Sequence, residues 1–226
     1  WEELLTNSVS ELNLPWKNSI SINVSNSGNR KLFKMFEEDS SKLTDFCKNS
    51  KISPFTFIAS VYGDLISRLS GEKKFNIAVP VANRFTKKNM EICGYFVNTI
   101  PLNFNFSEKD TVHNRLRYHH KAFLGMVSKS DTDLNLKCNV MFVFQSRPSS
   151  TNKDRDEIEY LRLNNKKSKY DISLSVTFEE NCYVFEWEYK KDLLDDSRID
   201  SFNNYLFRLM NGYITNPNDE FTSISL

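Results

Sequence analysis

The chain has 226 residues, of which 39% are hydrophobic, and its 30 basic and 29 acidic side chains give a formal net charge of +1. That length can hold one large domain or two small ones with a sizeable core, and the balanced charge gives no reason to expect nucleic acid or an acidic membrane as a partner. No apolar run approaches the roughly 20 residues that a membrane span needs, and the first residues lack the basic and apolar regions of a signal peptide, so a cytoplasmic location is expected.

The first predicted helix spans residues 54–70. Ser53 and Pro54 make a typical helix start, a serine cap followed by proline, and Gly71 stands where a C-terminal cap belongs. The apolar residues that recur between them at helical spacing are Phe57, Ile58, Val61, Leu65, Ile66 and Leu69. Residues 74–79 then have the pattern of a strand.

A polar linker over residues 85–93 leads to a second predicted strand, from about Tyr95 to Phe106. Its apolar residues alternate onto one face, and Asn98 interrupts that face. A buried amide without a hydrogen-bond partner costs about 1–3 kcal/mol. Asn98 is therefore either a hydrogen-bonded structural amide that ties a loop to the sheet, or a polar group that points into a channel.

Residues 110–129 form the next predicted helix, and an apolar strand over residues 137–145 follows it, predicted to be buried on both faces. The residues predicted for the inner side of this helix are Val112, Leu116, Phe123, Leu124 and Val127. The polar stretch 146–157 is interpreted as a loop within the domain, because strand patterns resume beyond it.

Residues 170–178 and 183–189 alternate strictly on either side of a turn near Glu180 and Asn181, which predicts a hairpin with one aromatic-rich face. A last helix is predicted to start at a cap formed by Ser197 with Asp200. Its core stripe is Ile199, Phe202, Leu206, Leu209, Met210 and Tyr213. Helices mixed with strands indicate an α/β domain with a mixed β-sheet and packed helices.

The four cysteines are far apart in sequence and, with the three histidines, give no metal-ligand spacing, so no metal site is predicted. An extracellular disulfide framework is one interpretation, but free cytosolic thiols are favoured. The cysteines are Cys47, Cys93, Cys138 and Cys182.

Two segments carry a family resemblance. The run Gly-Tyr-Phe-Val-Asn-Thr at 94–99 resembles the G-x-F-V-N-T motif of the condensation domains of non-ribosomal peptide synthetases, and Val-Pro-Val-Ala-Asn-Arg at 79–84 resembles the segment that precedes it there. Further segments fit in the same order: Trp1 with 12–15, 56–71, 140–145, 169–174, and the closing helix with Asn216-Pro217. The resemblance spans essentially the whole chain, but only the C-terminal lobe of a two-lobed domain.

The resemblance implies a chloramphenicol-acetyltransferase-like lobe and a single domain over residues 1–226, with the N-terminal lobe absent. It implies amide bond formation between acyl and aminoacyl thioesters, an acyltransferase reaction of secondary metabolite and antibiotic biosynthesis. No cofactor is expected to bind directly, because phosphopantetheine is carried by partner carrier proteins. The implied partners are the N-terminal lobe, peptidyl or aminoacyl carrier protein domains and an adenylation domain.

His119 and His120 resemble the family's catalytic His-His-x-x-x-Asp-Gly signature only in the histidine pair. Phe123 follows where an acid would be hoped for, and the pair falls inside a predicted helix downstream of the Phe-Val-Asn-Thr motif. Both histidines are therefore interpreted as part of a solvated helix face, and His113 as a surface residue at the helix start. No catalytic residue is expected in this chain, which is expected to be inactive alone.

The candidate site residues follow from the resemblance. Tyr95, Asn98 and Gln145 are expected at the substrate tunnel or among the polar groups behind it. Arg84 is expected either to pair with an acid across the lobe interface or to fix the loop after its strand. Asp171 is placed with it as an interface or structural residue.

Two departures from the family pattern concern the strand after Asn98 and the crossover before Gln145. The family's arginine four or five residues after the asparagine is replaced by Leu102-Asn103, and the crossover between residues 129 and 137 is short. The alternatives are a free-standing acyltransferase that uses coenzyme A thioesters and a non-catalytic domain that binds carrier proteins.

Overall fold

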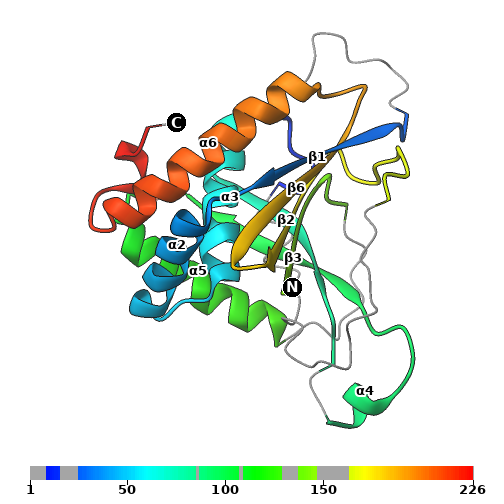
Figure 1. Ribbon diagram of the computed structural model, residues 1–226, viewed down its shortest axis with the longest axis horizontal. Coiled ribbons are helices and arrows are strands. Elements are labelled where there is room, and N and C mark those ends of the chain that lie inside the picture. Colours follow the sequence, from blue (N-terminus) through cyan, green and yellow to red (C-terminus); the bar gives the residue numbers. More distant parts are fainter. Residues whose placement is uncertain are drawn as a thin grey trace.

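The computed structural model describes residues 9–15, 25–84, 87–106, 109–128, 137–146 and 163–225. Within these ranges a six-stranded mixed sheet is packed against helices (Figure 1), which confirms the predicted fold class. Trp1, the predicted crossover between residues 129 and 137, and the predicted polar loop from residue 147 onward lie outside the described residues.

The strands lie in the order β1-β6-β5-β4-β2-β3. The neighbours β2 and β4 run parallel, as do β4 and β5, and the other neighbours are antiparallel. Their bounds are β1 Gly28–Lys34, β2 Lys74–Val81, β3 Asn98–Asn105, β4 Val140–Ser146, β5 Ile172–Glu179 and β6 Cys182–Lys190. The parallel pairs put the carboxyl ends of β2, β4 and β5 at one end of the sheet.

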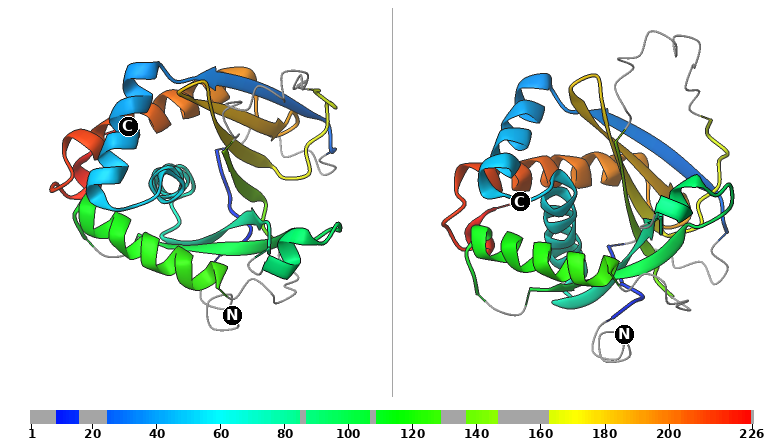
Figure 2. Two further views of the ribbon diagram at one scale, coloured as in Figure 1. Left: turned by 60° about the horizontal axis from the view of Figure 1, so that its bottom comes forward. Right: turned by 90° about the horizontal axis from the view of Figure 1, so that it is seen from below.

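Four long helices lie on one side of this sheet (Figure 2). They are α2 Glu37–Ser50, α3 Pro54–Ser70, α5 Val112–Val127 and α6 Asp196–Thr215; a short helix, α4 Lys87–Glu91, stands away from the body of the molecule beside β3 (Figure 1). The core between helices and sheet is aromatic: Tyr62 of α3 lies 5.8 Å, between ring centroids, from both Phe142 and Trp187. None of the helices in the described ranges is both long and apolar enough to cross a bilayer.

The predicted starts and turns that depend on local chemistry are confirmed. The hydroxyl of Ser53 accepts a hydrogen bond from the backbone amide of Thr56, and Gly71 ends α3 with a φ of +77°. Glu180 and Asn181 both have positive φ, as a tight turn of this hand requires.

Three expectations about faces and caps are wrong. The strand β4 is buried on one face only, because the helices cover one side of the sheet: Val140 and Phe142 are buried, Met141 is half-buried and Gln145 is exposed. On α5, Leu124 is 60% exposed and does not belong to the inner side.

The cap of α6 is Asp195, whose carboxylate accepts from the amide of Arg198 at 2.9 Å, while Asp200 instead pairs with Lys31 at 2.6 Å. The linker predicted over 85–93 contains α4, and β1 and α2 are elements that the sequence patterns did not reveal.

Candidate functional site

Asn98 and Gln145 come to the same end of the sheet. Asn98 opens β3 opposite Val81, the last residue of β2. Gln145 lies near the end of β4, which runs parallel to β2 with Ala78 opposite Met141. The register therefore places both side chains at the carboxyl ends of β2 and β4, where the loop that carries Tyr95 also joins the sheet.

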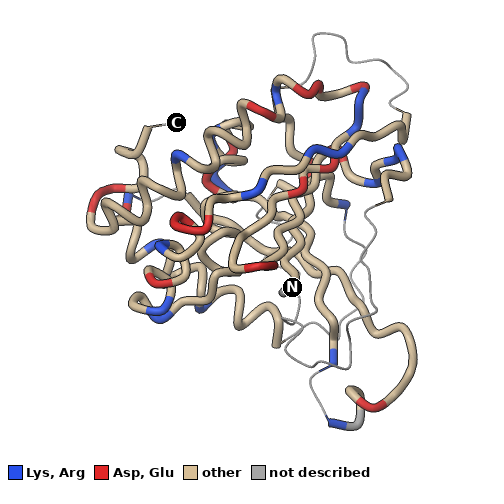
Figure 3. Tube along the Cα trace, in the orientation of Figure 1, with Lys and Arg blue, Asp and Glu red and all other residues tan. Residues whose placement is uncertain are grey.

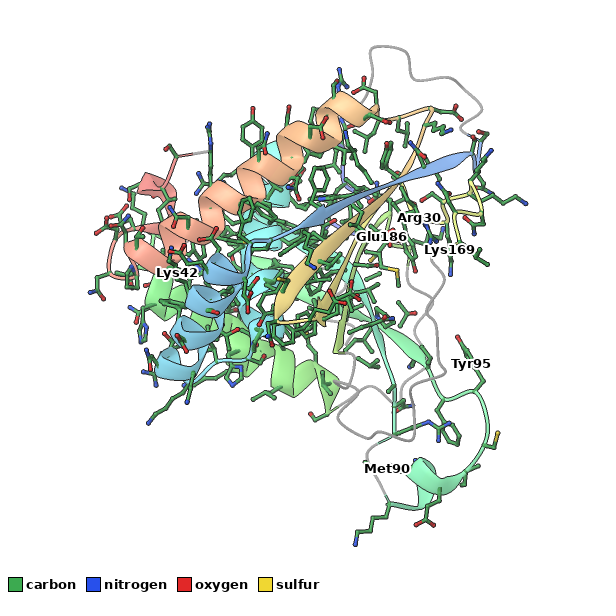
Figure 4. The ribbon with its side chains drawn as sticks, in the orientation of Figure 1. Arg30, Lys42, Met90, Tyr95, Lys169 and Glu186 are labelled. Carbon is green, nitrogen blue, oxygen red and sulfur yellow. The ribbon has the colours of Figure 1, made fainter. Side chains whose placement is uncertain are left out.

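Asn98 is half-buried, and its side-chain oxygen accepts a hydrogen bond from the backbone amide of Thr99 at 2.8 Å. Gln145 is exposed, opposite Thr177 of β5. Tyr95 is 90% exposed (Figure 4). The exposed amide of Gln145 and the exposed phenol of Tyr95 can therefore hydrogen-bond to a bound molecule.

The sheet face opposite the four long helices carries a polar row that crosses β5 at Ser173 and Ser175, four and two residues before Thr177, the partner of Gln145. Arg30 of β1 lies between two carboxylates of β6, with Nη1 3.3 Å from Glu186 and Nη2 2.6 Å from Glu188. Figure 3 shows the basic part of β1 running beside the acidic part of β6, and Figure 4 labels Arg30 and Glu186 side by side.

Hydroxyl groups continue the row on β5. Ser173 lies opposite Glu188 on one side and Met141 on the other, and Ser175 lies likewise between Glu186 and Val143. Ser173 is buried and Ser175 is half-buried, and no hydrogen bond within the described ranges engages either hydroxyl. The hydroxyl of Ser175 can therefore donate to, or accept from, a bound group.

Arg84 contacts its own loop. Its Nη1 donates to the carbonyl oxygens of Asn89 and Ile92, the latter at 2.7 Å, and its Nη2 donates to that of Gly94 at 2.8 Å. The guanidinium carbon lies 4.3 Å from the centre of the Phe96 ring. These contacts tie the end of β2 to the chain that leads into β3.

Asp171 lies at the opposite end of the sheet from Asn98 and Gln145, directly before β5. Its carboxylate pairs with Lys190 of β6 at 2.9 Å and accepts from the side chain of Asn139 at 2.9 Å. Asn139 in turn binds both the amide and the carbonyl of Leu12, each at 2.8 Å. Asp171 thus joins three segments of the chain and is not brought together with the other candidates.

The histidine pair is not on a solvated face. His119 is buried, with Nδ1 3.0 Å from the hydroxyl of Ser60, and burial together with the charge of Arg115 lowers the pKa of His119 to about 3. His120 is half-buried, with Nδ1 3.1 Å from the hydroxyl of Thr56, and His113 is half-buried at the start of α5. The prediction of a solvated face is therefore wrong, because α5 turns this side toward α3.

No three His, Cys, Asp or Glu side chains in the described ranges are grouped so that they could hold a metal ion. The four cysteines carry free thiols. Burial raises the pKa of Cys47 and of Cys138 to about 12, so neither is a thiolate at neutral pH.

Comparison with known proteins identifies the family. The model of the condensation domain family matches residues 1–226. The phosphinothricin tripeptide synthetase PhsC of Streptomyces viridochromogenes is 24% identical over 242 aligned residues, covering 99% of this chain and 22% of that protein.

Solved structures share the fold at low sequence identity. The X-domain from teicoplanin biosynthesis superposes with a TM-score of 0.84 at 13% identity, covering all of this chain and 56% of that one. The condensation domain of the polyketide synthase MokA superposes with a TM-score of 0.77 at 14% identity, covering 96% of this chain and 55% of that one. The chain thus spans about half of these solved structures and less than a quarter of the synthetase. It belongs to the condensation domain family.

Proposed function

We propose that this chain is the C-terminal lobe of a condensation domain in a non-ribosomal peptide synthetase, and that the complete domain joins two carrier-bound groups through an amide bond. One observation carries the proposal: the family model matches every residue, yet the chain spans only about half of the solved relatives. The other half would be the N-terminal lobe. The protein would act in the cytoplasm, with carrier protein and adenylation domains as partners.

In the proposed reaction an acceptor amine attacks the carbonyl carbon of a donor thioester. The new C–N bond forms, the C–S bond breaks, and the phosphopantetheine thiol on the carrier protein leaves with the proton that the amine loses. A histidine of the N-terminal lobe would act as general base or stabilise the transition state. The buried neutral His119 is not suited to that task, because no substrate reaches it.

This chain would supply one wall of the substrate tunnel. Asn98, Gln145 and Tyr95 lie at one end of the sheet, and Gln145 shares the face that carries the serines of β5 and the glutamates of β6. Preorganised polar groups of this kind orient a reacting thioester and stabilise charge that develops on it.

The test is a single-turnover assay with aminoacyl groups loaded on donor and acceptor carrier proteins. The complete domain should form the dipeptidyl thioester, and this chain alone should form none. Coenzyme A thioesters serve as the comparison substrate. Turnover of free coenzyme A thioesters in preference to carrier-bound ones would favour the free-standing acyltransferase.

A non-catalytic interaction domain is the second candidate, and one comparison favours it. The X-domain from teicoplanin biosynthesis, solved also in complex with OxyB, has the same fold over the full length of this chain. Under that alternative, the complete protein would bind carrier proteins without forming product, and its N-terminal lobe would lack the histidine signature.

A further inference from the structure

The loop of residues 87–97 presents an apolar surface that the rest of the described chain does not cover. Four of the ten large hydrophobic side chains exposed in the described ranges belong to it. They are Met90, Ile92, Tyr95 and Val97, exposed by 64%, 42%, 90% and 44%. Figure 4 shows Met90 and Tyr95 projecting from the loop away from the sheet and the long helices. Concentrated exposure of this kind marks an interaction surface.

Arg84 contributes to the order of this loop through several contacts. Arg84 reaches the carbonyl oxygens of Asn89, Ile92 and Gly94, and its plane covers the ring of Phe96. The planar guanidinium donates in several fixed directions at once and stacks on an aromatic face. Its anchor is the end of β2, where Asn83 turns the chain with a φ of +51°.

We propose that Arg84 is a positioning residue, which holds the 87–97 loop in the shape that docks on the N-terminal lobe. The inference rests on the proposed function, and the lobe that it requires corresponds to the half of the solved condensation domains that this chain does not span. Arg84 itself makes its contacts within the loop, so it acts on docking through the apolar side chains. A loop ordered before binding loses less conformational entropy when it docks, which raises affinity.

The first arm of the test uses this chain alone and follows amide hydrogen exchange in residues 87–97. Arg84→Ala should raise exchange there by about ten-fold or more, and it should leave the melting temperature within about 2 °C, because the loop lies outside the core. Arg84→Lys should exchange like Arg84→Ala, since one ammonium group cannot replace a fork that reaches three carbonyls and a ring. Arg117→Ala, at an exposed arginine of α5, is the matched control and should leave exchange unchanged.

The second arm measures binding to the N-terminal lobe, expressed separately from the reading frame upstream of Trp1. Arg84→Ala and Tyr95→Ala should each weaken binding about ten-fold, and the double variant should be within about three-fold of the weaker single variant, because both changes remove the same ordered contact. Losses that multiply to about a hundred-fold would show independent contacts and overturn the positioning role.

The two arms separate the proposals. If Arg84→Ala leaves amide hydrogen exchange in residues 87–97 unchanged, the positioning role is overturned even if the two lobes bind each other. If the unmodified chain fails to bind the lobe, both the docking claim and the proposed function are overturned, while the exchange result still decides whether Arg84 orders the loop.

Discussion

The Nδ1 atom of His119 lies 3.0 Å from the hydroxyl oxygen of Ser60, and neither side chain is exposed to solvent. The hydroxyl of Ser60 donates its hydrogen to the carbonyl of Thr56 at 2.7 Å, so the histidine must donate from Nδ1. The Nε2 atom of His119 is buried without a hydrogen-bond partner in the described ranges. This arrangement suits a neutral imidazole, because a proton on Nε2 would create an unpaired buried charge.

The buried imidazole predicts a loss of stability in acid. The pKa of His119 falls from 6.5 to about 3 on folding, so between these values the unfolded state binds more protons than the folded state. The contribution is fully present above pH 6.5 and is lost as pH falls toward 3, at up to about 1.4 kcal/mol per pH unit. Denaturant unfolding between pH 7 and pH 5 measures this slope.

The matched variants for that experiment are His119→Phe and His120→Ala. The rings of Phe104, Phe106 and Phe123 already surround His119 with centroids 5.2–5.6 Å away, so phenylalanine suits the site. His119→Phe should flatten the pH dependence, and His120→Ala should not. An equally steep loss in His119→Phe would assign the slope to other groups.

Features that depend on neighbouring residues were predicted more accurately than features that depend on contacts between distant parts of the chain. The start of α3 and the β5–β6 turn depend on residues within four positions of one another, and both were predicted correctly. The burial of His119 depends on α3, which lies about sixty residues earlier, although its position three residues after Leu116 and four before Phe123 was an available signal. For the same reason, the one-sided burial of β4 could not be predicted from its own sequence, because it depends on which face of the sheet the helices cover.

The candidate site shows the same limit. Sequence motifs named Asn98 and Gln145, but their placement at one end of the sheet follows from parallel pairing of β2 and β4 across some sixty residues. The polar row between Arg30 and the two glutamates of β6 was not predicted, because each residue is an ordinary strand position until β1 pairs with β6.

Removing the side chain of His119 or His120 should not affect catalysis. In the complete condensation domain, His119→Ala and His120→Ala should leave turnover per folded molecule unchanged within a few-fold, because neither side chain borders the sheet end where Asn98 and Gln145 lie. The folded fraction must be measured alongside, since His119→Ala leaves a cavity in the core. A loss of a hundred-fold or more in His120→Ala would contradict the assignment of catalysis to the other lobe.

Asn98→Ala separates a tunnel role from a purely structural one. If the amide serves the reaction, turnover in the complete domain should fall about ten-fold or more with little change in melting temperature, since a preorganised polar group at a reaction centre contributes more than about 1.4 kcal/mol. Asn103→Ala on the same strand is the control. A structural amide would instead give a loss of about 1–3 kcal/mol in unfolding free energy with the activity of the folded fraction intact.

The ion pair between Asp64 and Arg68 predicts that substitutions of these two residues change the unfolding free energy in a strongly non-additive way. Burial raises the pKa of Asp64, while Arg68 and the hydroxyl of Tyr213 oppose that shift. Arg68 also donates to the carbonyls of Phe221 and Ile224 at 2.7 and 2.6 Å, so it fastens the C-terminal segment to α3.

Removal of the arginine therefore leaves a buried carboxylate without its cation. Arg68→Ala should lower the unfolding free energy by about 3–5 kcal/mol. Adding Asp64→Asn should restore part of that loss, because the amide carries no charge to bury. Denaturant unfolding of both single variants and the double variant gives the coupling energy, and strictly additive losses would contradict it.

The last prediction concerns association of the isolated chain. On the sheet face opposite the long helices, Met141 and Val143 of β4 are half-buried, and the 87–97 loop adds exposed apolar side chains at its end. A lobe separated from its partner should therefore expose more contiguous apolar area than the few hundred Å² usual for a monomer.

Sedimentation velocity should show self-association at micromolar concentrations, or a complex when the N-terminal lobe is added. Met141→Ser with Val143→Ser should weaken both, whereas Leu124→Ser, at a more exposed apolar position on α5, should weaken neither. A monomer that fails to bind the added lobe would favour an independent acyltransferase or interaction domain over a lobe of a larger condensation domain.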